Sequence, residues 1–178
     1  MKIVRIKTYG LFDFFIVIAA VIASLVLLNW LPQALQKDTM RRYAGVDEVR
    51  TKLNLKNIFV PSYFPSNITW PPSEVLAQTK PYPAVLMAFY RADSQEVLLV
   101  ISQATETSFP SDSFISFDKI TEAVPFHFKS RQALLEVGSC RTAGPCSRIS
   151  WLESGYYIML AMKSPPFELI RIAESVHD

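Results

Sequence analysis

The two cysteines, Cys140 and Cys146, are the residues whose type and spacing most directly suggest chemistry. They enclose only residues 141–145 and lie between two segments with strand-like patterns, so we predict a disulfide across the base of a hairpin. A redox-active pair normally has the tighter Cys-x-x-Cys spacing, and a zinc site would need two further ligands. Redox and metal roles are therefore the weaker alternatives for this pair.

The two histidines do not complete a catalytic or metal-binding pattern. His127 lies between Phe126 and Phe128 in an apolar segment, where we expect a partly buried structural imidazole, and His177 follows the last predicted helix. The sequence contains no nucleophile elbow, phosphate-binding loop, dinucleotide fingerprint or His-Glu-x-x-His helix. We therefore predict that the protein is not an enzyme and that it has no catalytic residues, no cofactor and no metal site.

The longest apolar run of the sequence covers residues 11–31. At 1.5 Å per helical residue it spans roughly 31 Å, which matches the hydrocarbon core of a bilayer. A secretory signal peptide is the alternative, but its apolar core is usually about 7–15 residues long and ends at a small-x-small cleavage site. We therefore predict an uncleaved transmembrane helix at residues 11–31, preceded by a cytoplasmic tail at residues 1–10.

The orientation of this helix is predicted from its flanking charges. Basic residues nearly balance across it: Lys2, Arg5 and Lys7 precede it, and Lys37, Arg41 and Arg42 follow it. Acidic residues after the helix and the oxidised cysteine pair favour a cytoplasmic N-terminus. We therefore predict a single-pass protein of the inner (cytoplasmic) membrane, with a periplasmic or extracellular C-terminal domain.

Asp13 is the ionisable residue inside the apolar run, and it allows two interpretations. Its carboxylate can reach the cytoplasmic headgroups or Lys7, or it can pair with a polar group on a partner's transmembrane helix. The run also contains small residues suited to close helix approach: Ala19, Ala20, Ala23 and Ser24. The segment is therefore a candidate helix-packing element as well as an anchor to the lipid bilayer.

The rest of the chain has the composition of one ordinary domain. Residues 32–44 are predicted as a stalk or linker, in which the membrane helix continues past Pro32 and breaks near Gly45, and residues 45–178 as the domain. The chain has 18 Lys and Arg against 16 Asp and Glu, and beyond Arg41 and Arg42 it has no basic cluster. We therefore exclude nucleic acid as a partner.

Hydrophobic periodicity predicts an α+β domain with an antiparallel β-sheet packed by one or two helices. Val46, Val49 and Leu53 predict a short helix, and residues 97–101 are apolar on both faces, which indicates a strand covered on both sides. A closing helix is expected at residues 166–176, with Ser164 as its N-cap and Phe167, Ile170, Ala173 and Val176 on one side. Strands are predicted at residues 75–79, 84–91, 96–103, 123–128, 132–137, 148–153 and 156–162.

The last quarter of the chain resembles an uncharacterised bacterial family. The resemblance is carried by Ile149-Ser150-Trp151-Leu152-Glu153, by Tyr156-Tyr157-Ile158-Met159-Leu160, by the helix at residues 167–176, and by the proline-bounded segment at residues 60–65. In that family a small α+β domain follows one membrane helix, often in proteins of anti-sigma or envelope signalling. The family's usual glycines are absent here, where Pro65-Ser66 and Met162-Lys163 stand instead. The resemblance implies a fold and a setting, and no catalytic residues.

Rigid aromatic and proline residues are the best candidates for contact with a partner. They are Tyr63, Phe64, Trp70, Pro71, Pro72 and Tyr82. The simpler alternative for Phe64 and Trp70 is that they close the core. We predict a non-catalytic accessory or regulatory subunit that contacts another membrane or envelope protein. The second hypothesis is a membrane-tethered binder or carrier of a lipid or other apolar ligand, with a cavity lined by Leu86, Ala88, Val100, Phe126 and Met159.

Overall fold

The computed structural model describes residues 16, 18–22, 24, 26, 40–91, 94, 96–107, 114–142 and 144–177. It divides the chain into two compact units, Met1–Thr39 and Met40–Asp178. The described residues of the first unit are helical, and the hydroxyl of Ser24 donates a hydrogen bond to the carbonyl oxygen of Ala20 at 2.8 Å. The remainder of the predicted membrane segment, with Asp13 and Ala23, lies outside the described residues. Within the described part of the chain, none of the helices has the length and apolar character needed to cross a bilayer.

The second unit contains an eight-stranded, entirely antiparallel sheet with the order β1-β3-β4-β5-β9-β8-β7-β6. The strands are β1 (Arg41–Tyr43), β3 (Glu74–Gln78), β4 (Ala84–Tyr90), β5 (Val97–Ala104), β6 (Phe117–Phe128), β7 (Arg131–Cys140), β8 (Pro145–Glu153) and β9 (Tyr156–Met162). A separate two-stranded sheet pairs β2 (Val60–Pro61) with β10 (Val176–His177). The prediction of an α+β domain built on an antiparallel sheet is confirmed.

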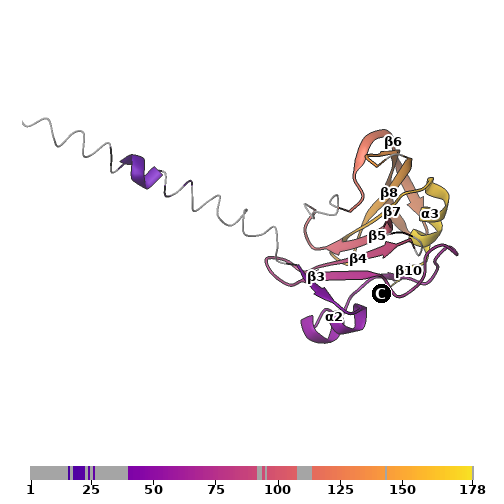
Figure 1. Cartoon of the computed structure of the whole chain (residues 1–178), viewed down its shortest axis with the longest axis horizontal. Helices are drawn as coiled ribbons and strands as arrows, with labels where there is room; N and C mark the ends of the chain where they lie inside the picture. The colour runs from indigo at the N-terminus through magenta and orange to yellow at the C-terminus, as the bar shows by residue number, and fades with distance from the viewer. Residues whose placement is uncertain are drawn as a thin grey trace, which may run out of the picture. The chain divides into compact units, whose positions relative to one another are not determined.

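Apart from β1 at one edge, the large sheet consists of two meanders, β3-β4-β5 and β6-β7-β8-β9, and Figure 1 shows them side by side. They join where β5 pairs with β9, for example Ile101 with Leu160. Because β5 and β9 are central, both of their faces are covered, which explains why their sequences are apolar on consecutive residues. Leu99 and Val100 are both fully buried although they point to opposite faces.

The main core lies on the face of the sheet that carries both helices. α2 (Val46–Leu53) packs against β1 and β3, and α3 (Pro166–Glu174) packs against β8 and β9, as Figure 1 shows for α3. Buried residues of α3, Leu169, Ile172 and Ala173, join the apolar side chains of the central strands in one cluster. This face of the sheet is therefore committed to packing.

The opposite face holds a second, smaller cluster. Leu86 and Ala88 of β4 and Val100 of β5 pack there with Ile115 and with the two cysteines. This arrangement corrects the predicted lipid cavity, because Leu86, Ala88 and Val100 lie in the second cluster whereas Phe126 packs against the main one. Phe126 therefore does not share a face of the sheet with Leu86, Ala88 and Val100.

Three expected helical features are wrong. Arg41 and Arg42 were expected at the end of a helical stalk, but they lie in β1, where they pair with Ala77 and Leu76 of β3. Ser164 does not cap α3, because its hydroxyl donates to the carbonyl oxygen of Pro165 and the helix starts without a side-chain cap. The helix also ends at Glu174, because Val176 pairs with Pro61 in the small sheet.

Strand β6 begins at Phe117, six residues before the predicted start at residue 123. Register shifts between Phe117 and Lys119, and between Ile120 and Glu122, interrupt the alternation that sequence analysis relies on. His127, expected to be partly buried, is exposed on this strand. Its neighbours Phe126 and Phe128 point to the opposite face, toward the core.

Candidate functional site

The predicted contact residues Phe64 and Trp70 meet at the end of β4. The ring centroid of Phe64 lies 5.2 Å from that of buried Phe89 and 5.9 Å from that of Trp70, which is itself 6.4 Å from Phe89. Phe64 thus closes the core, as the simpler alternative proposed. Trp70 rests on the same aromatic group and still has 47% of its surface exposed. Its indole is therefore both held in place and accessible.

Tyr63 is held by helix α3. Its hydroxyl donates to Oε2 of Glu168 at 3.0 Å, its ring lies 4.4 Å from the guanidinium carbon of Arg171, and its backbone N–H donates to Oγ of Ser175. The pKa of Tyr63 is raised, chiefly by desolvation and secondly by this hydrogen bond to Glu168. The residue is fixed in place, which lowers the entropic cost of contact with a partner.

Phe167 at the start of α3 is an exposed aromatic that sequence analysis missed. Sequence analysis placed it on the buried side of the helix, but it is 76% exposed because the buried positions are Leu169, Ile172 and Ala173. It immediately precedes Glu168, the partner of Tyr63. A helical pattern that starts from Leu169 and Ile172 instead of Ile170 would have placed Phe167 outside the buried side of the helix.

The remaining predicted contact residues do not all lie at this place. Pro71 is exposed beside Trp70, whereas Pro72 is buried. Tyr82 lies two residues before β4, and Phe89 lies near the other end of this strand, roughly 16 Å from its first residue, Ala84. We use the name aromatic ledge for Tyr63, Phe64, Trp70 and Pro71, and Tyr82 does not belong to it.

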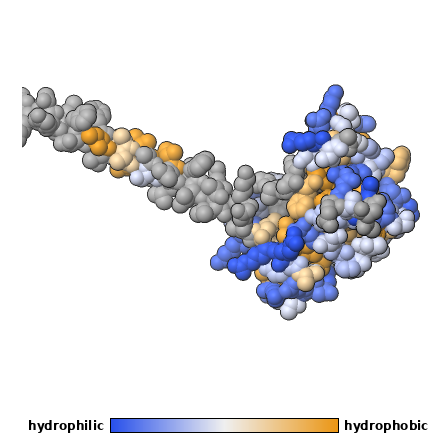
Figure 2. Space-filling model, viewed as in Figure 1, coloured by the Kyte–Doolittle hydropathy of each residue, from blue (hydrophilic) through white to orange (hydrophobic). Residues whose placement is uncertain are grey.

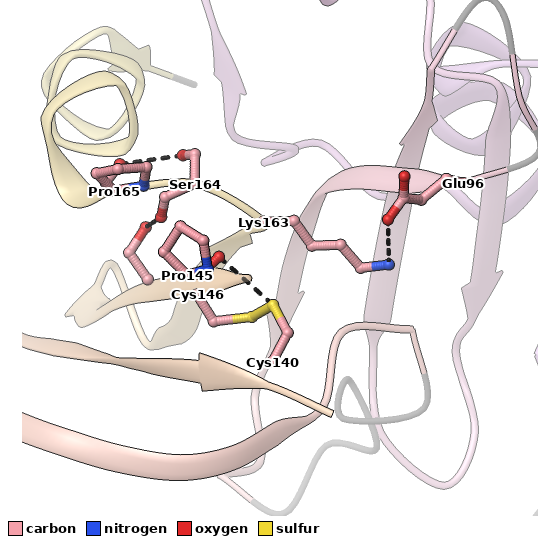
Figure 3. Close-up of a disulfide and its surroundings, with 8 residues drawn as sticks. Glu96, Cys140, Pro145, Cys146, Lys163, Ser164 and Pro165 are labelled. Carbon is pink, nitrogen blue, oxygen red and sulfur yellow. Dashed lines mark hydrogen bonds and ion pairs between the residues drawn. A yellow bond between two sulfur atoms is a disulfide. The ribbon is translucent and has the colours of Figure 1, made fainter. Parts of the chain in front are cut away.

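The predicted disulfide between Cys140 and Cys146 is confirmed, with 5.2 Å between the Cα atoms (Figure 3). Both cysteines are buried in the second apolar cluster. Sγ of Cys140 lies 3.5 Å from the carbonyl oxygen of Pro145, and the backbone N–H of Arg141 donates to the carbonyl oxygen of Ser116. The hairpin end is thereby held against the segment that carries Ile115.

Close to the disulfide, the segment after β9 is tied to neighbouring elements. The hydroxyl of Ser147 donates to the carbonyl oxygen of Ser164 at 3.0 Å, and Nζ of Lys163 lies 3.0 Å from Oε1 of Glu96 (Figure 3). This ion pair lowers the pKa of Glu96, chiefly through the hydrogen bond from Lys163. These contacts fix the polypeptide that leads into α3.

An open hollow of about 380 Å³ lies on the face of the sheet that carries the second cluster. Side chains from four strands line it: Pro125, His127, Gln132, Leu134, Ser150 and Tyr157. Sequence analysis missed the hollow because its residues are scattered over four strands and come together only through the strand register. Among the described residues, no group of three His, Cys, Asp or Glu could hold a metal ion there or elsewhere.

The surface of the domain carries exposed apolar side chains among charged residues. Figure 2 shows apolar surface on one face of the domain, bordered by hydrophilic residues. Exposed apolar side chains outside the aromatic ledge include Leu134 of β7 and Leu152 of β8.

Comparison with protein-family models, with curated proteins and with solved structures found no match for this chain.

Proposed function

We propose that this chain is a non-catalytic, single-pass membrane protein that acts as an accessory or regulatory subunit of a membrane or envelope complex. In this proposal residues 11–31 anchor it in the inner (cytoplasmic) membrane with a cytoplasmic N-terminus, and the domain lies in the periplasm or outside the cell. The disulfide between Cys140 and Cys146 supports an oxidising compartment for the domain.

The observation that carries the proposal is the half-exposed indole of Trp70 on the aromatic ledge. Its ring is supported by Phe64 and Phe89, so it presents a large apolar contact area with little freedom left to lose. Tryptophan and tyrosine held in this way are the residues that dominate the binding energy of protein interfaces. We therefore assign the aromatic ledge as the contact surface for a protein partner.

The test is to extract the full-length protein from its native membrane in mild detergent, purify it by a C-terminal tag and identify companions by mass spectrometry. Trp70→Ala should reduce the recovery of a stoichiometric companion protein at least about tenfold, which corresponds to about 1.4 kcal/mol. Leu152→Ala is the matched control, because Leu152 is also an exposed apolar residue but lies on β8. Thermal unfolding of both variants checks that they fold.

A second pair of variants tests the proposed role of the membrane segment. Asp13→Asn and Ala23→Leu should release the companion if the helix packs against a partner helix in the membrane. A reporter active only in the cytoplasm, fused after Asp178, should remain silent. Recovery of the protein without a companion but with one enriched lipid would contradict the subunit proposal and favour the lipid-carrier hypothesis.

A further inference from the structure

We propose that the hollow on the sheet face, lined by Ser150, Gln132, His127 and Tyr157, binds a neutral saccharide. This site is separate from the aromatic ledge, and the inference does not rest on the proposed function. It follows from the register of the strands, from the mixture of polar and apolar side chains in the lining, and from the absence of charged residues on the walls among the described residues.

The register of four strands brings the lining residues together. Pro125 of β6 pairs with Leu134 of β7, Leu134 pairs with Ser150 of β8, and Ser150 pairs with Met159 of β9. In the next row His127 pairs with Gln132. Residues two apart on a strand share a face, so both rows point to the same side of the sheet. Tyr157 of β9, two residues before Met159, completes the wall.

The lining combines hydrogen-bonding groups with an apolar floor. Gln132, His127, Ser150 and Tyr157 supply hydrogen-bond donors and acceptors, and none of them is a carboxylate, an ammonium or a guanidinium group. Pro125 and Leu134 supply apolar surface, and Leu134 has 40% of its surface exposed. A sugar ring presents both kinds of surface, hydroxyls at its edge and C–H groups on its faces. The hollow therefore matches a saccharide in its chemistry.

Two charged residues beside this row of side chains are paired with each other. Glu136 and Arg148 lie on the same face, one step along their strands from Leu134 and Ser150, and Nε of Arg148 lies 2.6 Å from Oε2 of Glu136. No Lys, Arg, Asp or Glu lines the hollow itself within the described part of the chain. A phosphate, a sulfate or a metal ion would find no counter-charge on these walls, so the ligand class is neutral.

Ser150 lines the hollow although the residue is only 5% exposed. Its hydroxyl can both donate and accept a hydrogen bond at the wall.

The same geometry argues against a peptide or an acyl chain as the occupant. β7, β8 and β9 are paired on both sides, so their backbone groups are used within the sheet and cannot bind an extended peptide by strand addition. An acyl chain needs an enclosed apolar cavity, whereas this hollow is open and carries four polar side chains. Its volume is at the small end of the range for small-molecule sites, roughly 300–1,000 Å³.

The test uses the full-length protein in phosphatidylcholine nanodiscs free of glycoside detergents, which are themselves sugars. Chitotriose, maltotriose and cellotriose are titrated separately to about 10 mM, and binding is followed by saturation-transfer difference NMR. We expect saturable binding of at least one of them. Gln132→Ala and Tyr157→Ala should each weaken it at least about tenfold, and Tyr157→Phe, which keeps the ring, should weaken it less.

Thr121→Ala is the control, because Thr121 is an exposed polar residue on β6 outside the hollow. It should leave binding unchanged, and circular dichroism should show that all variants fold. The proposal is overturned if none of the three sugars binds saturably. It is equally overturned if binding survives both Gln132→Ala and Tyr157→Ala, or if a sulfated disaccharide binds more tightly than the neutral probes.

Discussion

The backbone N–H of Phe59 donates a hydrogen bond of 2.8 Å to Oε1 of Gln103, a side chain on central strand β5. Nε2 of the same Gln103 donates to the carbonyl oxygen of Asn57 at 2.9 Å. One buried amide thus substitutes for strand pairing along the segment between α2 and β2. This segment places Phe59 in the main core and leads the chain toward Tyr63 and Phe64.

Replacing Gln103 with leucine should therefore destabilise the domain. Gln103→Leu keeps a similar volume but leaves the Phe59 N–H and the Asn57 carbonyl without partners, which costs about 1–3 kcal/mol. Denaturant unfolding should show a lower midpoint with an unchanged slope. Gln132→Leu is the control, since Gln132 is exposed on β7. Equal stability of the two variants would contradict the role given to Gln103.

Gly138 should not tolerate a side chain. A Cβ atom added there would lie 2.0 Å from the carbonyl oxygen of Lys119, because the irregular part of β6 crosses close to β7 at this point. Gly138→Ala should lower the free energy of unfolding by about 1–3 kcal/mol, the usual cost of overpacking. Gly45→Ala is the matched control, since a Cβ there meets nothing within 4 Å. Thermal unfolding of both variants measures the difference, and equal stability of the two would contradict the close approach at Gly138.

Removal of the disulfide should destabilise the domain moderately. Its loop is short, so the chain-entropy model gives only about 2 kcal/mol for the double variant Cys140→Ala, Cys146→Ala. Loss of the buried sulfurs from the second cluster adds to this value. Chemical denaturation measures the change, and peptide mapping without reductant should recover residues 140 and 146 as one cross-linked pair. Free thiols in the native protein would contradict the structure.

The ion pair between Glu96 and Lys163 predicts a pH dependence of stability. The hydrogen bond from Lys163 lowers the pKa of Glu96 in the folded state, so this carboxylate stabilises the fold at pH values above its unfolded pKa of about 4.5. The contribution is lost as the pH falls through the folded value. Glu96→Gln should therefore lose less stability between pH 6 and pH 3 than the native protein, as measured by thermal unfolding. Parallel curves would contradict this linkage.

The regular parts of the sheet could be predicted from the sequence because their apolar pattern reflects burial. β4, β5 and β9 follow the expected segments closely, since central strands bury consecutive residues on two faces. β1 could not be predicted in this way. Its residues, Arg41–Tyr43, are polar, and the strand is held by pairing with β3 and by the ion pair of Arg42 with Glu74.

The two surface sites differ in how far the sequence reveals them. Phe64 and Trp70 belong to a segment rich in aromatic residues and proline, and this composition alone is enough to predict them as candidate contact residues. Whether each side chain is buried depends on contact with Phe89, which is distant in sequence. The hollow depends even more on long-range pairing, because Gln132, Ser150 and Tyr157 share a face only once β7, β8 and β9 are in register.

The two edge strands of the large sheet limit the aggregation of this domain when many copies are close together. One edge, β1, is only three residues long, and the other, β6, carries two register shifts and Pro125, which has no N–H to offer. Neither edge is a good template for an additional strand. The domain is therefore protected against open-ended stacking into aggregates, and its associations are directed to the side chains on its faces.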